Sequence, residues 1–513
     1  MRLGHLILAI CLLAVNALPV VAQCTGPNGN RFNLEPRPNA VVQTADSVAV
    51  LPNGAGSGRD LVVAAGSDGR GLFSNLNATL ISEGAFYVQR SSSNCAADFE
   101  GGLPSISNII DLFIPTEGAS VVADPARDAF FIVNLEFGSF TDDNGVGIYR
   151  TTATNLLSSS ACPNGTEIGT ASCWTTGAVT DVTELNAFLS HPNITVDPRA
   201  TGTGAGDVYA VVSQADPNDT LHKSVFLTAC VNSNLNCSNS IKISGGDLEA
   251  DYAWVQVRPD GGITISYRNT SFPGINPEDI KFVNCTPNGA PKTPTCSAAT
   301  LVLTEKTPIF AASLGDVPMD DALFPKHVDR LESDGKTVTT FLVYDKCEVA
   351  VIPQLGAGSP FCPKTDVVLL SSNNGGITWS PISKVSNGKG HQFFGAIALD
   401  SSTSTVNIAY YSTENDFFLQ RPQVFLTQIA PGAITAGTPQ LLTSASADVE
   451  ASSPISLLDQ PAGFGDRLGL AAAGTGTSGQ SHAYTSFTWN SVAGTYNGIS
   501  SVDVNNHLTS FEY

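Results

Sequence analysis

The chain has 513 residues, with 25 lysines and arginines against 46 aspartates and glutamates, so its formal net charge at pH 7 is −21. Such an acidic chain makes nucleic acid and anionic membranes unfavourable partners, because like charges repel. Only 14% of the residues are charged, and glycine is abundant, with 47 residues. This composition is typical of an all-β secreted protein rather than a helical one.

The N-terminal segment, residues 1–22, has the features of a secretory signal peptide. Arg2 supplies a basic start, an apolar run covers residues 6–18, and small residues up to Ala22 precede the expected cleavage site. The run is too short for a good transmembrane span, and no later segment has about 18 consecutive apolar residues. We therefore predict export to the extracellular space or the periplasm, with an N-terminal extension over residues 23–39 of the mature chain.

Ten cysteines follow the signal segment, an even number that suggests disulfides in an oxidising compartment. Connectivity does not follow from sequence alone, but the close spacing favours sequential pairs that each close a local loop. Metal binding by these cysteines is not favoured, because neither a CxxC motif nor a Cys/His cluster occurs. The predicted pairs are Cys162–Cys173, Cys230–Cys237, Cys285–Cys296 and Cys347–Cys362, with Cys24–Cys95 tying down the mature N-terminus.

From residue 40 onward the chain repeats a unit of roughly 55–80 residues. Each unit has an apolar strand, a turn at Asp, Pro or Gly, a second strand, a polar loop, a third strand and a weaker fourth. In the unit at 250–305, the segment AWVQVRPDGGITISYRN starts at Ala253 and is followed by DIKFVNC. Seven units can be counted, at 40–100, 115–185, 190–245, 250–305, 325–385, 390–445 and 460–513.

Radial repetition of four-stranded sheets closes such a chain without long exposed strand edges. A β-helix would have a shorter period, and a β-sandwich would not need so many similar units. Helical periodicity is scarce along the chain. We therefore predict an all-β fold: a single β-propeller over residues 40–513 with seven four-stranded blades, or six because the first unit is irregular.

The segment SSNNGGITWS, residues 371–380, lies between the third and fourth strands of its unit. It resembles the Asp-box, or BNR repeat, of sialidases and related β-propellers, whose pattern is S/T-x-D-x-G-x-T/S-W. Ser and Asn side chains can bond nearby backbone groups, and Gly tolerates positive φ, so we predict a structural turn. In the family such turns lie on the face away from the active site. The matching residues are Ser372, Asn374 (in place of Asp), Gly376, Thr378 and Trp379.

Functional residues are therefore expected on the opposite face, which is built from the segments before each first strand and from the second-to-third-strand loops. Charged and aromatic side chains gather at these places along the sequence. They are Asp247, Glu249, Asp251, Arg268, Asp320, Asp321, Lys326, His327, Asp329, Arg330, His391, Tyr410, Tyr411, Glu414, Asp416, Arg421, Asp466 and Arg467.

The resemblance to sialidases implies three kinds of functional group. Arginines clamp the substrate carboxylate, a Tyr activated by a Glu acts as nucleophile, and an Asp serves as acid and base. Tyr411 with Glu414, and Asp320 or Asp321, match the last two roles, with Asp466 as a further catalytic candidate. The segment FIPT at residues 113–116 lacks the arginine of the family's F-R-I-P signature. The candidates for substrate binding are Arg268, Arg330, Arg421, Arg467, His327 and His391.

Structural roles are the alternative for several of these residues. Asp329 and Asp466 could be turn or strand hydrogen-bonding groups, and Asp320 with Asp321 could help to hold a structural Ca²⁺ ion. No other metal site or cofactor is predicted, because His327 and His391 are isolated in sequence and no nucleotide-binding or hydrolase motif occurs.

The predicted function is glycan-directed: binding or hydrolysis of carbohydrate at the mouth of the propeller channel. The main alternative is a non-catalytic secreted scaffold that binds protein or cell-surface partners through the same face. A third hypothesis is a lyase or another hydrolase on a propeller. Glycans or glycoproteins are therefore the expected partners, without nucleic acid and without a membrane span.

Overall fold

The computed structural model describes most of the sequence that the repeats cover. The described residues are 32–33, 43–57, 60–68, 83–89, 99–104, 106–107, 112–115, 119–138, 144–158, 160–162, 173–176, 189–216, 219–270, 278–305, 312–314, 317–319, 324–348, 364–419, 421–443, 468–474, 481–496 and 499–513.

Five antiparallel sheets among the described residues have four strands each. The first is β2 (Gln43–Leu51), β3 (Leu61–Asp68), β4 (Glu83–Gln89) and β5 (Phe99–Gly102). The second is β12 (Leu189–Val196), β13 (Val208–Asp216), β14 (Asp219–Cys230) and β15 (Ile241–Lys242). The third is β23 (Lys326–Leu331), β24 (Val338–Cys347), β25 (Thr365–Ser372) and β26 (Ser383–Lys384). The fourth is β27 (Gln392–Asp400), β28 (Thr405–Ser412), β29 (Gln423–Ile429) and β30 (Gln440–Leu441), and the fifth is β31 (Gly469–Ala473), β32 (His482–Tyr496), β33 (Ile499–Glu512) and β1 (Phe32–Asn33).

Two sheets are larger. The five-stranded sheet has β16 (Ala250–Val257), β17 (Ile263–Thr270), β18 (Glu278–Thr286) and β19 (Thr295–Cys296), with β20 (Thr300–Glu305) also on β18. The six-stranded sheet has β6 (Ile106–Ser107), β7 (Leu112–Pro115), β9 (Ala129–Gly138), β10 (Asn144–Thr152) and β11 (Thr175–Thr176), with β8 (Ser120–Asp124) on β9. The remaining described elements are the pair β21 (Ala312–Leu314) and β22 (Val317–Met319), the helix α3 (Ala153–Leu157) and the 3-10 turn η1 (Gly54–Gly56).

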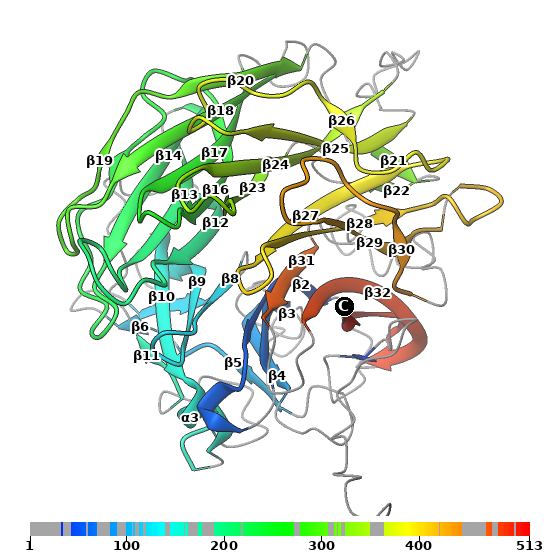
Figure 1. Cartoon of the computed structure of the whole chain (residues 1–513). Coiled ribbons are helices and arrows are strands. Elements are labelled where there is room, and N and C mark those ends of the chain that lie inside the picture. Colours follow the sequence, from blue (N-terminus) through cyan, green and yellow to red (C-terminus); the bar gives the residue numbers. More distant parts are fainter. Residues whose placement is uncertain are drawn as a thin grey trace, which may run out of the picture.

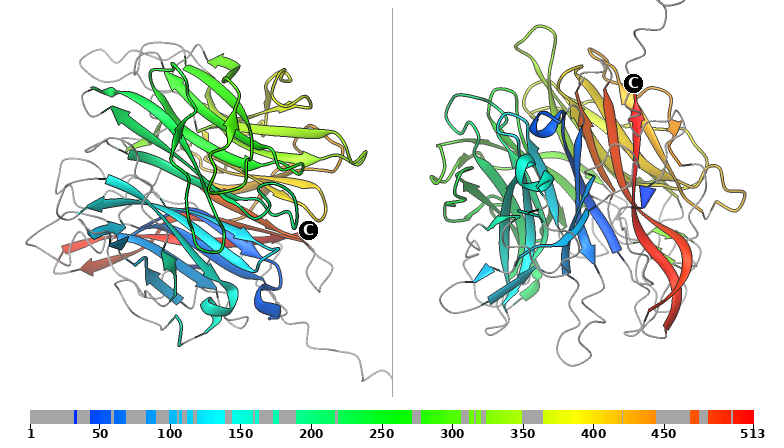
Figure 2. Two further views of the ribbon diagram at one scale, coloured as in Figure 1. Left: turned by 90° about the vertical axis from the view of Figure 1, so that its left-hand side faces the viewer. Right: turned by 90° about the horizontal axis from the view of Figure 1, so that it is seen from below.

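The sheets are arranged as a β-propeller, with the last sheet beside the first (Figure 1). Their inner strands contact one another in a closed circuit: β2, β8, β12, β16, β23, β27, β31 and back to β2. Residues of these strands line a central cavity of about 300 Å³. The side views in Figure 2 show the twist of the sheets, which is usual for β-structure. The predicted all-β propeller is therefore confirmed.

The predicted number of four-stranded blades differs from the structure, which has five among the described residues rather than seven or six. In the other two sheets, short additional strands join the edges: β20 pairs with β18, and β7 pairs with β9. The repeat in the sequence predicts where apolar strands lie. It does not predict which strand a short strand of a few residues will pair with. β1 illustrates the same point, because it pairs with β33 at the far end of the chain.

The core consists of apolar layers between neighbouring sheets. In one layer, Phe131 of β9 and Ile148 of β10 pack with Ile194 of β12 and Val208 of β13. All four side chains are buried. Burial of such a side chain contributes about 1.5–3 kcal/mol, so these layers stabilise the contact between adjacent sheets.

The structure contains three of the predicted disulfides, each within a local loop. They are Cys162–Cys173, Cys230–Cys237 and Cys285–Cys296. Cys347 is also disulfide-bonded. Its predicted partner, Cys362, lies outside the described residues, as do Cys24 and Cys95.

The segment from residue 371 to residue 380 forms the turn between β25 and β26. Ser372 Oγ accepts from the Gly376 N–H at 3.0 Å, and Asn374 Oδ1 accepts from the Thr378 N–H at 3.0 Å. The Trp379 indole N–H donates to the Gly376 carbonyl at 3.1 Å. The side chains that match the repeat pattern thus bond the turn's own backbone, as local side-chain-to-backbone bonding predicts.

Gly376 offers a test of how tightly this turn packs. Its φ is +79°, and a Cβ there would overlap the ring of Phe282. We expect Gly376→Ala to lose about 1–2 kcal/mol from the left-handed conformation and about 1–3 kcal/mol more from overpacking. Gly432, with φ +74° and no atom within 4 Å of a Cβ, is the matched control. Gly432→Ala should lose only the free energy that the left-handed conformation costs. Urea unfolding measures both variants, and equal losses would contradict the packing argument.

Candidate functional site

One end of the propeller is marked by β-bulges in the inner strands. At the bulges in β12, β16 and β27, His191, Tyr252 and Phe394 have φ angles of 51°, 55° and 55°. Positive φ is uncommon for residues other than glycine, and bulges redirect side chains next to functional sites. The register shifts lie between Ser190 and Asn193, between Asp251 and Trp254, and between Phe393 and Ala396.

Two of these bulges bring together a histidine, a lysine and a buried carboxylate. His191 Nδ1 lies 2.9 Å from Asp251 Oδ1, and Lys223 Nζ lies 2.6 Å from Asp251 Oδ2. Asp251 Oδ1 also accepts from the Ser190 hydroxyl and from the Tyr252 N–H. Asp251 is the second residue of β16, whereas His191 and Lys223 belong to the adjacent sheet, so the cluster spans the junction of two sheets.

The cluster keeps Asp251 ionised. Burial alone would raise the pKa of Asp251, but His191 and Lys223 outweigh it and hold this pKa below its ordinary value. A carboxylate beside Nδ1 orients the ring so that Nδ1–H donates to Asp251. The other ring nitrogen, Nε2, is then the one that can exchange a proton with a ligand. This is the arrangement by which a carboxylate orients a histidine as a general base.

Tyr252 connects this histidine to further aromatic rings and cations. The ring centroids of His191 and Tyr252 are 3.8 Å apart, and Arg268 Cζ lies 4.4 Å from the centroid of the Tyr252 ring. Further along, Lys326 Nζ lies 5.1 Å from the centroid of the Phe324 ring, which contacts Tyr252 edge-on. A site with cations and aromatic faces suits an anionic ligand that also has apolar surface.

Arg268 lies near the end of β17, beside a group of acidic side chains. Burial raises the pKa of Glu278 to about 7, although Arg268 lowers it, while Glu249 and Glu305 raise it further. Glu278 is therefore partly protonated near neutral pH.

Several predicted site residues lie at this end but have structural partners. His327 is buried, with Nδ1 2.8 Å from Ser266 Oγ and Nε2 3.0 Å from Thr264 Oγ1. Burial lowers the pKa of His327 to about 3, so the imidazole is neutral at pH 7. Lys326, its neighbour, donates to the Leu468 carbonyl.

The predicted residues of the β27–β30 sheet lie at the same end, around the end of β28. Tyr411 is fully buried and stacks on Phe393, with ring centroids 5.3 Å apart. Glu414 accepts from the Ser412 hydroxyl at 3.3 Å. The His391 N–H donates to Thr413, and the exposed Arg421 donates its backbone N–H to Asp416.

Arg330 lies at the opposite end of the propeller, near the end of β23. Its guanidinium donates to the carbonyls of Ala430 and Ala433 at 3.0 and 2.7 Å. Asp329 is buried there and accepts from the hydroxyls of Thr264 and Thr340. The structure therefore does not bring Arg330 and Arg268 together. Four further predicted residues, Asp320, Asp321, Asp466 and Arg467, lie outside the described residues.

Sequence reasoning missed His191, Lys223 and Tyr252. His191 and Tyr252 occupy equivalent places at the start of successive units, next to the predicted candidate Asp251. A comparison of equivalent positions in neighbouring units would have found this pair. The bulge itself gives no sequence signal here, because the residues with positive φ are not glycines.

Two further observations concern the described residues only. No helix among them is long and apolar enough to cross a membrane. Within the same part of the chain, no group of three or more His, Cys, Asp and Glu side chains is arranged to hold a metal ion.

Comparisons with known proteins place the chain among several similar structures. No model of a protein family matches it, and no curated protein sequence does. Similar solved structures include a protein of unknown function from Dyadobacter fermentans, at 9% identity and TM-score 0.44, covering 95% of this chain and 100% of that one. The Hadza microbial sialidase Hz136 has 9% identity and TM-score 0.42; the match covers 85% of this chain and 74% of that one. The polysaccharide lyase Uly1 has 11% identity and TM-score 0.42; the match covers 91% of this chain and 89% of that one.

Proposed function

We propose that the protein binds a uronate-containing polysaccharide at the bulged end of the propeller and cleaves it by β-elimination. The observation that carries this proposal is the juxtaposition of His191, Tyr252 and Arg268, with His191 held by the ionised Asp251. These groups supply a base, a phenol and a cation in one place.

The three groups match the needs of the reaction. Arg268 pairs with the uronate carboxylate, which makes the proton on the adjacent carbon more acidic. His191 Nε2 removes this proton, and the electron pair forms a carbon–carbon double bond as the glycosidic oxygen leaves. The Tyr252 hydroxyl gives its proton to the leaving oxygen, and proton transfer from His191 through water restores the phenol. No oxidant, metal or covalent intermediate is needed.

We prefer β-elimination to the hydrolytic hypothesis because Arg330, one of the predicted substrate-binding arginines, lies apart from Arg268. A sialidase-type clamp needs several arginines around one carboxylate. Arg268 is at the bulged end, whereas Arg330 bonds two carbonyl groups at the other end.

The proposal extends to the whole chain. The five- and six-stranded sheets would complete a seven-bladed ring, which the closed circuit of inner strands supports. Residues 1–22 would direct export and residues 23–39 would precede a propeller over 40–513. Three disulfides among the described residues support an oxidising compartment.

An assay of the purified protein on three polysaccharide classes tests the activity. We expect uronate-containing polysaccharides to yield ultraviolet absorbance from the new double bond, together with new reducing ends. Neutral polysaccharides should yield neither signal, and sialylated glycans should release no sialic acid. Reducing ends without ultraviolet absorbance would show hydrolysis, and binding without cleavage would show a non-catalytic scaffold. Either result would overturn the proposal.

A further inference from the structure

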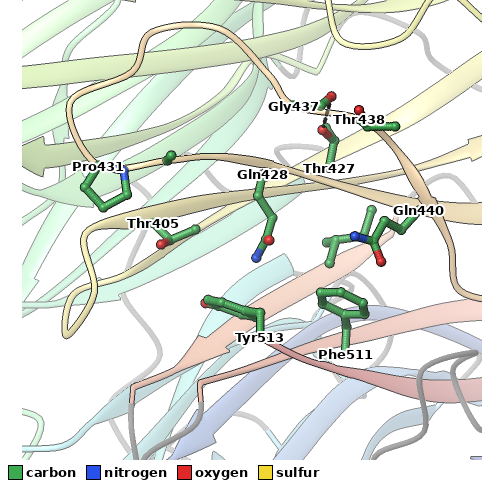
Figure 3. A pocket seen from close by; sticks show the side chains of 11 residues that line it. Thr405, Thr427, Gln428, Pro431, Gly437, Thr438, Gln440, Phe511 and Tyr513 are labelled. Carbon is green, nitrogen blue, oxygen red and sulfur yellow. Dashed lines mark hydrogen bonds between the residues drawn. The ribbon is translucent and has the colours of Figure 1, made fainter.

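A second pocket lies at the end of the propeller opposite His191. It has a volume of about 340 Å³ and opens between the β27–β30 sheet and the end of β33 (Figure 3). Thr405 at the start of β28 and Gln428 near the end of β29 place it at the end of the third-to-fourth-strand turns. Its size is in the range of small-molecule sites.

One wall of this pocket is aromatic and held in place. The rings of Phe511 and Tyr513 stack with centroids 6.2 Å apart and planes 18° apart. The Tyr513 hydroxyl donates to Asp400 Oδ2 at 3.1 Å and accepts from Asn407 Nδ2 at 3.0 Å. The hydroxyl end is thus anchored, and the ring needs little ordering when a ligand binds.

The facing wall carries amide and hydroxyl groups. Gln428 extends from β29 toward Tyr513, and Gln440 lies above Phe511 (Figure 3). Gln428 Nε2 donates to Asn407 Oδ1 at 2.8 Å, which orients this amide. Thr427 and Thr438 add hydroxyl groups. Among the described residues that line the pocket, none has a charged side chain.

These two walls select the chemistry of the ligand. A sugar ring offers an apolar C–H face, which packs on an aromatic ring, and hydroxyl groups that pair with amides and hydroxyls. A charged ligand would lose hydration in this pocket without gaining an ionic partner among the described lining residues.

We propose that this pocket is a second carbohydrate site, which binds a neutral sugar ring against Phe511 and Tyr513. It goes beyond the cleavage proposed above and does not depend on it. The two ends of the propeller then select different sugars: the bulged end an anionic one, and this pocket a neutral one.

Titration of the full-length protein with neutral monosaccharides, followed by saturation-transfer NMR, tests this site. The probes are glucose, galactose, mannose, xylose and rhamnose. We expect millimolar binding of at least one probe, weakened tenfold or more in Gln428→Ala and Tyr513→Ala and retained in Tyr513→Phe. If Tyr513→Ala does not fold, Gln440→Ala, which alters an exposed side chain, takes its place with the same expected loss.

Two control variants separate this site from the other end of the propeller. His191→Ala removes the proposed base, and Phe417→Ala removes a ring that is 90% exposed on the β28–β29 loop. Both should bind the neutral probe as the unaltered protein does. The proposal fails if no probe binds at tens of millimolar, if Gln428→Ala and Tyr513→Ala bind normally, or if His191→Ala abolishes binding. Ultraviolet product formation is measured separately, so failure of one proposal leaves the other standing.

Discussion

His191→Ala is expected to reduce kcat/KM for uronate-containing polysaccharide by about 100- to 10,000-fold, which is the usual contribution of a general base. The His191 side chain is 15% exposed and lies at the mouth of the site rather than in the apolar core. The fold should therefore survive the change, although Asp251 keeps Lys223 as its only described cationic partner. Initial rates of ultraviolet absorbance, with a melting curve for each variant, measure both effects.

His222→Ala is the matched control for this prediction. His222 is exposed on β14, directly before Lys223. Its removal should leave kcat/KM within about twofold of the unaltered protein. If His191→Ala keeps more than a tenth of the activity while its melting temperature is unchanged, His191 is not the base.

Asp251→Ala is expected to have the largest effect on stability, a loss of about 3–5 kcal/mol of unfolding free energy. The buried carboxylate accepts from His191, Lys223, Ser190 and the Tyr252 backbone. Removal of the carboxylate leaves these groups without their shared acceptor at the junction of two sheets. Asp251→Asn keeps the shape but not the charge, so it should lose less. Urea unfolding at pH 7 measures both variants.

The same carboxylate predicts a pH dependence of stability. Because His191 and Lys223 outweigh burial, the pKa of Asp251 is lower in the folded state than in the unfolded state. The unfolded chain therefore takes up the proton first, and the unfolding free energy falls as the pH drops below about 4. Asp251→Asn should lack this part of the acid sensitivity.

Asp279→Asn is the control for the Asp251 variants. Asp279 is 28% exposed, with Lys281 at 3.5 Å, and exposed pairs contribute about 1 kcal/mol or less. Comparable losses in Asp251→Ala and Asp279→Asn would show that the Asp251 cluster does not hold the sheets together.

The side chains at the repeated bulge differ from sheet to sheet, which confines the site to one part of the ring. In β27 the equivalent position carries Phe394, whose N–H donates to Asp345 at 2.6 Å. Burial raises the pKa of Asp345 to about 7, although the Phe394 and Gly395 N–H groups lower it. The backbone geometry is thus repeated around the propeller, but only the β12 and β16 bulges, among those described, supply an imidazole and a phenol side by side.

Features that depend on contacts within a few residues were determined by the sequence alone. Alternating apolar strands predict the all-β repeat, and close cysteine spacing predicts the three described disulfides. The bonds within the turn over residues 371–380 follow from Ser372, Asn374 and Gly376 in the same way. In each case the partners are neighbours along the chain, so their geometry varies little with the rest of the fold.

Only the tertiary structure decided the number of strands in each sheet and the composition of the site. His191 and Asp251 are 60 residues apart and meet because two sheets pack side by side. Arg330 was expected on the same face as Arg268, yet β23 begins at Lys326 and carries Arg330 to the far end of the channel. A strand rises about 3.3 Å per residue. An error of a few residues in the predicted start of a strand therefore places a side chain at the wrong end of the channel.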